Sequence, residues 1–178
     1  ACRLELLSLT GRATGTQPAL NLAQAIIKGD AMDRLLQKAT ELGVAAVWLL
    51  TSEFTQVGAQ RAEARMAHWQ KVLISAAEQS RRLTLPRLHP PTPIEQFLKS
   101  HNAPTRVLLQ PGSAPLPRDL ARQETTLIVG PEGGWAPSEL DAAALTDVAL
   151  HSMGNLTLRA ETAPLAALAA VQHAWGWC

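Results

Sequence analysis

The sequence predicts an α/β fold, a mostly parallel sheet flanked by helices, on two observations. Short apolar segments typical of strands alternate along the chain with segments of helical periodicity. The run at residues 44–50 is continuously apolar, as expected of a strand that is buried on both faces of a parallel sheet. A chain of 178 residues, 47% hydrophobic and 17% charged, is long and apolar enough for one domain with a sizeable core.

The first half of the chain is expected to form two strands and two helices in alternation. Residues 20–27 are predicted to be the first strand, and Asp30 is the expected N-cap of a helix that Gly43 ends. Residues 44–50 form the second expected strand. Apolar side chains spaced three, four and seven residues apart predict a long amphipathic helix over residues 61–80.

The middle of the chain is expected to be a loop followed by a short helix. The loop is the proline-rich segment 86–93. Thr92, Pro93 and Glu95 match a capping box with proline at the first helical position, which predicts a helix that ends at Ser100.

The last third of the chain repeats the alternation. Strands are expected at residues 106–110, 125–129 and 148–153, with a helix over residues 137–145. The last helix, over residues 162–175, is apolar almost all the way round and must be buried on more than one side. Packing on the domain's own core together with a subunit interface would bury it.

Charge and cysteine content restrict the possible partners. Sixteen Lys and Arg against fifteen Asp and Glu give a net charge of +1, so any contact with RNA must be local. Residues 61–87 hold a local excess of six basic over two acidic residues. Cys2 and Cys178 support neither a disulfide framework nor a cysteine-based metal site, which predicts a reducing, cytoplasmic location. No apolar run approaches the roughly 18 residues that span a bilayer, so no membrane partner is expected.

The glycine-rich segment GPEGG, residues 130–134, follows the strand predicted at residues 125–129. In open α/β sheets, ligands bind beyond the carboxyl ends of strands, and glycines there let the backbone approach a ligand closely. A tight turn with positive φ at Gly133 or Gly134 would explain the segment equally well. It lacks the Lys-Ser/Thr ending of a Walker loop, so phosphate binding is the weaker functional interpretation.

A second segment, MGNLTLRAETA at residues 153–163, also runs from a strand end into a helix start. Arg159 and Glu161 lie between an apolar strand and an apolar helix, where burying a charge is costly unless the charge is paired or used. The alternative is a structural pair between Arg159 and Glu161, with Thr162 as the helix N-cap.

Together with three shorter segments, these two resemble the RsmE family of 16S rRNA uridine-N3 methyltransferases, in the SPOUT superfamily. The resemblance extends from about Leu20 to the C-terminus and includes the order of the motifs. It implies that residues 19–178 form a SPOUT domain whose C-terminal chain is threaded into a trefoil knot. Residues 1–18 would then be a linker or a remnant of the N-terminal PUA-like RNA-binding barrel of the family. The three shorter segments are KGD at residues 28–30, QKATELG at residues 37–43 and AAEQS at residues 76–80.

The resemblance also implies S-adenosyl-L-methionine as the cofactor. The two motif loops would hold it through backbone groups and apolar walls. No metal is expected, because the sulfonium already activates the methyl group. The expected cofactor-binding residues are Leu109, Gly130, Pro131, Glu132, Gly133, Gly134, Met153, Gly154, Asn155, Leu156, Leu158 and Thr162.

Uridine N3 carries a proton, so its methylation requires a base or stabilisation of the anion that forms. Arg159 is the candidate for stabilising charge on the flanking carbonyl oxygens. Glu161 or Glu132 is the candidate proton acceptor, made more basic by burial. Either glutamate could instead position Arg159 or fix its loop.

RNA is expected to contact the basic face of the helix at residues 61–80 and the segment that follows it. A solvated surface is the alternative for any one of these side chains. Phosphate contacts of this kind confer affinity, while the site itself would select the base. The expected RNA-binding residues are Arg34, Lys38, Arg61, Arg65, Lys71, Arg81 and Arg82.

The resemblance further implies a homodimer joined by the last helix and a partner in 16S rRNA or the small ribosomal subunit. Four residues depart from the family pattern: Arg81 stands where glycine is usual, Ala136 where serine caps a helix, Trp135 where phenylalanine is usual, and Met153 where leucine is usual. Two other functions stay open: a SPOUT methyltransferase acting on another RNA nucleotide, and a non-catalytic RNA-docking dimerisation module.

Overall fold

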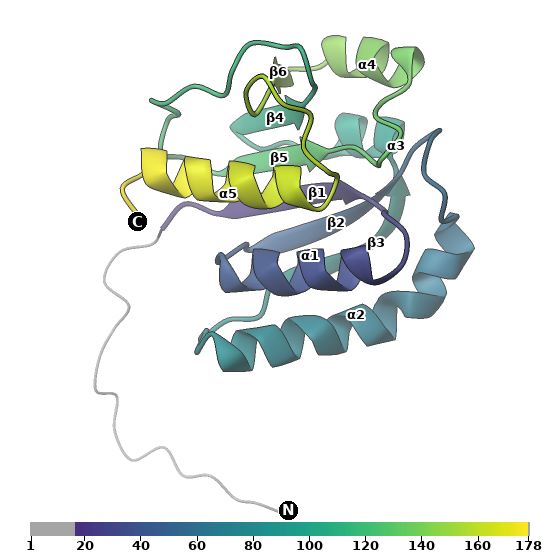
Figure 1. Cartoon of the computed structure of the whole chain (residues 1–178), viewed down its shortest axis with the longest axis vertical. Helices are drawn as coiled ribbons and strands as arrows, with labels where there is room; N and C mark the ends of the chain where they lie inside the picture. The colour runs from purple at the N-terminus through teal and green to yellow at the C-terminus, as the bar shows by residue number, and fades with distance from the viewer. Residues whose placement is uncertain (1–16, 178) are drawn as a thin grey trace, which may run out of the picture.

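The computed structural model describes residues 17–177. Most of the segment predicted as a linker or barrel remnant, and both cysteines, lie outside the described residues. The described chain forms one six-stranded sheet with helices on both faces (Figure 1). All neighbouring strands are parallel, in the order β3-β2-β1-β5-β4-β6, which confirms the expected fold class. The strands are β1 (Leu20–Ala25), β2 (Ala46–Thr51), β3 (Arg87–Pro93), β4 (Thr105–Leu109), β5 (Thr125–Val129) and β6 (Ala149–His151).

The helices divide between the two faces of the sheet, because alternate residues of each strand point to opposite sides. Leu22 and Leu127 belong to the core shared with α1, α2 and α5. Ala23 and Ile128, their neighbours in the same strands, belong to the core shared with α3 and α4. The helices are α1 (Asp30–Glu41), α2 (Ala59–Gln79), α3 (Ile94–Ser100), α4 (Pro137–Ala144) and α5 (Thr162–Ala174).

The path of the C-terminal chain brings distant segments together. The chain leaves β6 at the sheet edge and returns to the middle of the sheet, where α5 packs against β5 and β1 (Figure 1). The trefoil knot that the resemblance implies for this region stays a prediction. The return places the connection between β6 and α5 beside the end of β5.

The proline-rich segment forms β3, so the prediction of a loop at residues 86–93 was wrong. β3 pairs only with β2 and is one of the two edge strands of the sheet. Proline cannot donate a ladder hydrogen bond, but it is tolerated at an edge or a bulge. The register shifts between the pairs Trp48–His89 and Leu50–Thr92, so Pro90 and Pro91 lie in the irregular part of the strand.

Two predicted helix caps were also wrong. Asp30 is the first residue of α1, and the N-cap is Gly29 with φ of 67°. The Asp30 carboxylate lies in the first helical turn, where its negative charge interacts favourably with the helix dipole. Before α3, the Thr92 hydroxyl donates to the Pro90 carbonyl at 3.1 Å, and Pro93 caps the helix without a side-chain hydrogen bond.

Candidate functional site

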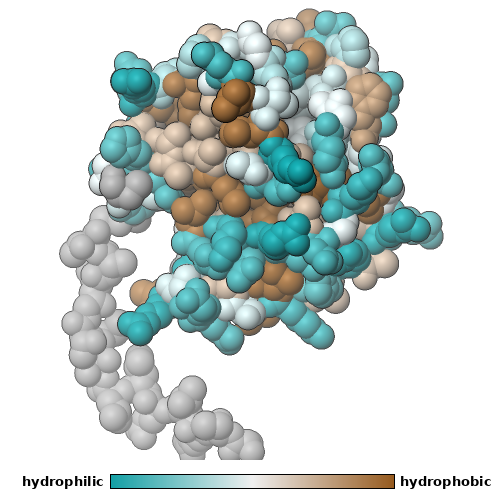
Figure 2. All heavy atoms as spheres, viewed as in Figure 1, coloured by the Kyte–Doolittle hydropathy of each residue, from teal (hydrophilic) through white to brown (hydrophobic). Residues whose placement is uncertain are grey.

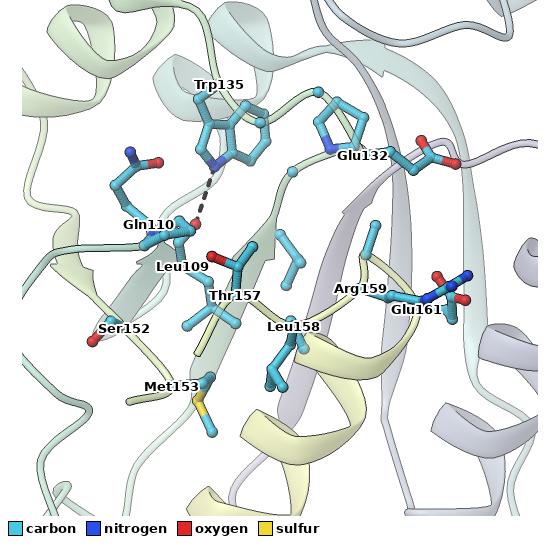
Figure 3. A pocket seen from close by; sticks show the side chains of 18 of the residues that line it. Leu109, Gln110, Glu132, Trp135, Ser152, Met153, Thr157, Leu158, Arg159 and Glu161 are labelled. Atoms are coloured by element: carbon cyan, nitrogen blue, oxygen red, sulfur yellow. Dashed lines mark hydrogen bonds between the residues drawn. The ribbon is translucent and has the colours of Figure 1, made fainter. Parts of the chain in front are cut away.

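The described residues enclose a cavity of about 760 Å³ at the carboxyl ends of β4, β5 and β6. Parallel strands end at the same edge of a sheet, which is why segments far apart in sequence meet there. Figure 3 shows Leu109, Trp135, Met153 and Leu158 around this cavity. It is lined by Lys28, Ala31 and Arg34, by residues 109–111, 129–135, 152–154 and 156–161, and by Ala163.

The GPEGG segment is both a tight turn and a wall of the cavity. The Gly134 amide donates to the Pro131 carbonyl at 3.0 Å, and Gly134 has φ of 75°. Gly130 is needed for a different reason: a Cβ there would lie 3.1 Å from the Trp135 indole. The two interpretations of this segment are therefore compatible.

Trp135 joins the ends of two strands. Its indole N–H donates to the Leu109 carbonyl at 3.3 Å, as the dashed line in Figure 3 shows. Only 7% of Trp135 is exposed, although it lines the cavity. The hydrogen bond therefore fixes the loop after β5 against the end of β4. Sequence analysis assigned Trp135 no role at the site.

Gln24, in the neighbouring strand β1, binds the same loop. Its side chain is fully buried, and its Nε2 donates to the Ala25 carbonyl at 2.9 Å and to the Gly130 carbonyl at 3.3 Å. Its Oε1 has no hydrogen-bond partner among the described residues. A polar residue inside an apolar strand was the signal that could have identified it.

The segment between β6 and α5 forms the opposite wall. Gly154 has φ of 106°, which a side chain would strain. The Ser152 amide donates to the Ala114 carbonyl at 2.8 Å and holds the start of the segment. At its end, the Arg159 carbonyl accepts from the amides of Thr162 and Ala163, both at 2.9 Å, which anchors Arg159 at the start of α5.

The three expected catalytic side chains all line this cavity, but they are not joined to one another. No described hydrogen bond or ion pair links Arg159 with Glu161, and Thr162 does not cap α5. The structural pair is therefore absent from the described contacts. Arg159 and Glu132 are exposed and Glu161 is half-buried, so Glu132 lacks the expected burial and Glu161 has only part of it. Glu132 accepts a long hydrogen bond, 3.5 Å, from the Lys28 amide.

All of the expected cofactor-binding residues line the cavity except Asn155 and Thr162. The strand ends could have indicated several residues that sequence analysis missed, because Gln110 and Ser152 directly follow β4 and β6, and Lys28 lies three residues after β1. Further lining residues that it missed are Ala31, Pro111, Val129, Trp135, Thr157, Ala160 and Ala163.

Three of the seven expected RNA-binding residues make internal contacts. Arg65 binds the Asp33 carboxylate at 3.1 Å and lies over the Trp69 ring. Lys38 pairs with Glu41 at 2.9 Å. The first contact joins α2 to α1, whereas the second is a pair on the surface of α1 itself.

Arg82 caps the C-terminal end of α1. Its guanidinium donates to the carbonyls of Thr40 and Val44, both at 2.9 Å. Burial lowers the pKa of the Arg82 guanidinium from its usual value. Arg82 therefore binds one carbonyl in the last turn of α1, where carbonyls lack helical partners, and one just after the helix.

Arg34, Arg61, Lys71 and Arg81 are exposed. Arg81 has φ of 56°, the left-handed conformation in which glycine is usual. Its amide donates to Glu78 and that of Arg82 to Ala77, the hydrogen bonds of a Schellman motif at the end of α2.

A second hollow, of about 620 Å³, lies beside α5. Residues 115–118 form one side, and Ala170, His173 and Ala174 of α5 form another. Residues 152–154 border both this hollow and the larger cavity. Within residues 17–177, no three His, Cys, Asp or Glu side chains are grouped to hold a metal ion. None of the described helices is long and apolar enough to cross a membrane.

The family model of the RNA methyltransferase domain matches residues 15–172 of this chain. A ribosomal RNA small subunit methyltransferase E from Rickettsia conorii is 33% identical over 169 residues, covering 92% of this chain and 68% of the relative. The chain belongs to this methyltransferase E family.

A second relative matches this chain in sequence, and the crystal structure of a third matches its fold. A methyltransferase E from Synechocystis is 32% identical over 160 residues, which cover 85% of this chain and 52% of the relative. The crystal structure of the Neisseria gonorrhoeae methyltransferase E, bound to S-adenosyl methionine, matches with a TM-score of 0.82 and 36% identity, over 91% of this chain and 69% of that one. This chain thus spans about half to two thirds of the length of these methyltransferase E relatives.

Proposed function

We propose that residues 19–178 are the catalytic domain of a cytoplasmic enzyme that transfers a methyl group from S-adenosylmethionine to N3 of a uridine in 16S rRNA. The observation that carries this proposal is the meeting of the two motif segments, residues 130–134 and 153–163, around one cavity. Family membership supports the reaction class.

The cavity fits S-adenosylmethionine in size and chemistry. Its volume of about 760 Å³ lies in the range of small-molecule sites, and Leu109, Met153 and Leu158 give it apolar walls. The close approach of Gly130 to Trp135 leaves no room for a side chain at that strand end. Backbone groups after β4, β5 and β6 would hold the polar parts of the cofactor. When bound, the cofactor supplies a methyl group that its sulfonium makes electrophilic.

Arg159 would provide the positive charge that the target base needs. As N3 of uracil loses its proton, negative charge spreads to the two flanking carbonyl oxygens. A guanidinium held near them lowers the energy of this anion. Arg159 suits the role because its backbone is anchored at the start of α5 and its side chain has no described partner.

The two cavity glutamates differ in their contacts, which supports different roles. Glu132 accepts from the Lys28 amide, so we assign it to positioning the loop after β5. Glu161 is half-buried at the start of α5 without a described hydrogen bond, so its carboxylate is available to accept the N3 proton.

We propose that the RNA backbone binds Arg34, Arg61, Lys71 and Arg81, the members of the expected basic set that are exposed and have no described ion pair. Arg65 and Arg82 would serve mainly to fix α2 and the residues after it to α1, and Lys38 would stay paired with Glu41 on the surface of α1. Exposed cations confer affinity through phosphate contacts, with a strong dependence on salt.

We also propose a homodimer through α5. Leu165, Ala166, Ala169 and Ala170 stay at least partly exposed on the helix, although every one is apolar. Figure 2 shows an apolar surface over α5. Ala169→Glu would place a charge in this interface and should convert a dimer to a monomer in light-scattering measurements.

The decisive experiment is to identify the methylated nucleoside. Small ribosomal subunits that lack the modification are incubated with the protein and S-adenosylmethionine, and nucleosides are then analysed by mass spectrometry. We expect 3-methyluridine. Methylation of another nucleotide would assign a different substrate, and cofactor binding without any methylation would favour the RNA-docking module.

A further inference from the structure

The connection between β2 and α2, residues 52–58, presents an aromatic side chain beside the cavity. Phe54 is 41% exposed and contacts Gly133 of the GPEGG segment. A Cβ at Gly133 would lie 2.8 Å from the Phe54 Cβ and 3.3 Å from its Cγ. Figure 1 shows this connection on the same side of the sheet as the connection between β5 and α4. One end of Phe54 is thus supported by the cavity wall while much of the residue faces solvent.

The backbone around Phe54 is held in place by a dense set of hydrogen bonds. The Ser52 amide donates to the Thr55 hydroxyl at 3.0 Å, and the Thr55 amide donates to the Ser52 carbonyl at 3.1 Å. The Glu53 amide donates at 2.9 Å to the carboxylate of Glu139. Phe54 is therefore presented from a fixed position.

Glu139 ties this loop to the loop that follows β5. It is only 2% exposed, and its second oxygen accepts from the Ala136 amide at 2.8 Å. A buried carboxylate with a donor from each loop holds the two at a constant separation. The distance between Phe54 and the cavity wall is fixed for the same reason.

The charges around Phe54 suit a nucleic acid strand. Lys28 and Arg34 line the neighbouring cavity, and the Lys28 ammonium donates to the Gln56 side chain of the same loop at 2.9 Å. Arg61 lies in the first turn of α2, directly after the loop. Glu53 and Glu132 are also exposed here, so the surface carries both positive and negative charges. The aromatic ring would therefore supply much of the attraction between this surface and RNA.

We propose that Phe54 stacks on a nucleobase that flanks the target uridine in the bound RNA strand. This inference rests on the proposed function, because it requires RNA to enter the cavity. Enzymes that modify a base must take it out of its stack, and the strand then needs a new surface for the exposed neighbour. An aromatic ring beside the cavity provides that surface for any base, since every base has a flat face.

The test compares Phe54→Leu, Phe54→Trp and Leu145→Ala. Leu145 is an exposed apolar residue, 88% exposed, that does not line the cavity, so its variant is the control. Affinity for a short single-stranded oligouridine and for S-adenosylmethionine is measured separately. We expect Phe54→Leu to weaken oligouridine binding about tenfold and to leave cofactor affinity unchanged, with Phe54→Trp and Leu145→Ala like the wild type.

A second measurement locates the contact directly. Oligouridine containing 5-iodouridine is irradiated with the wild-type protein, and we expect the crosslinked peptide to carry the base on Phe54. Unchanged oligouridine affinity in Phe54→Leu, or equal loss of cofactor and oligouridine affinity, would overturn the proposal. A wild-type protein that crosslinks at Phe54 but methylates no uridine would overturn only the proposed function.

Discussion

The indole N–H of Trp135 donates to the carbonyl oxygen of Leu109 at 3.3 Å and thereby joins the loop after β5 to the end of β4. Both residues line the cavity. Trp135→Phe keeps an aromatic ring, although a smaller one, and removes this hydrogen bond. We expect the free energy of unfolding to fall by about 1 kcal/mol and cofactor affinity to decrease. Urea unfolding and calorimetry with S-adenosylmethionine measure the two effects, and unchanged values in both would show that the hydrogen bond is unimportant.

Gly130→Ala tests the close approach at the end of β5. The added Cβ would lie 3.1 Å from the indole of Trp135 and push the ring away from Leu109. We expect a loss of roughly 1–3 kcal/mol in stability, together with weaker cofactor binding. Gly58→Ala is the matched control, because nothing lies within 4 Å of its Cβ position. Similar behaviour of the two variants would contradict the packing argument.

Arg159→Ala separates catalysis from cofactor binding. Because Arg159 is assigned to the developing anion, we expect methyl transfer to fall about a hundredfold or more while cofactor affinity stays near the wild-type value. Glu161→Gln should also slow transfer, whereas Glu132→Ala, which removes the acceptor of the Lys28 amide, should act mainly on cofactor affinity. Single-turnover rates and calorimetry distinguish these results. Wild-type turnover in Arg159→Ala would remove this residue from the mechanism.

Arg81→Gly should stabilise the protein. A non-glycine residue in the left-handed conformation is strained by about 1 kcal/mol, and Arg81 has φ of 56° at the end of α2. Arg81→Ala removes the charge but retains the strain, so it should give no such gain. Thermal unfolding of the two variants provides the comparison, and equal stability would mean that strain is not stored there.

Stability should decrease below neutral pH because of His89 and His101. Burial is the main cause that lowers the pKa of each imidazole from its usual value of 6.5, and both rings contact Trp48. As pH falls through 6.5, the unfolded chain therefore binds protons before the folded chain does. This loss of stability is complete once the pH falls below the pKa of the two imidazoles in the folded protein. His89→Phe should unfold with a smaller pH dependence in urea titrations between about pH 7.5 and 5.5, and an unchanged dependence would exclude His89 as a source.

The order of elements could be predicted because each strand and helix carries its own periodicity. β3 could not, because its three prolines conceal a strand that forms only by pairing with β2. The motif loops indicated most of the cavity wall, since strand ends and glycines are local signals. Trp135 and Gln24 escaped sequence analysis because their roles depend on backbone carbonyls elsewhere in the fold.

The basic residues illustrate a further limit of sequence analysis. Counting the basic residues within residues 61–87 does not reveal which of their side chains already bind other groups of the protein. Arg65 and Arg82 find their acceptors on or just after α1, at Asp33, Thr40 and Val44. Such partners are decided by how two helices pack, so the pattern alone overestimated the cations available to RNA.

Residues 152–154 form a shared partition between the larger cavity and the hollow beside α5. A small molecule on one side and a neighbouring subunit on the other would touch the same three residues. If the small molecule changes the affinity for the neighbouring subunit through the conformation of these residues, the subunit must change the affinity for the small molecule by the same factor. Dimer formation and cofactor binding would then be linked equilibria. The affinity for the cofactor would therefore depend on the concentration of the protein, and the dimer dissociation constant on the concentration of the cofactor.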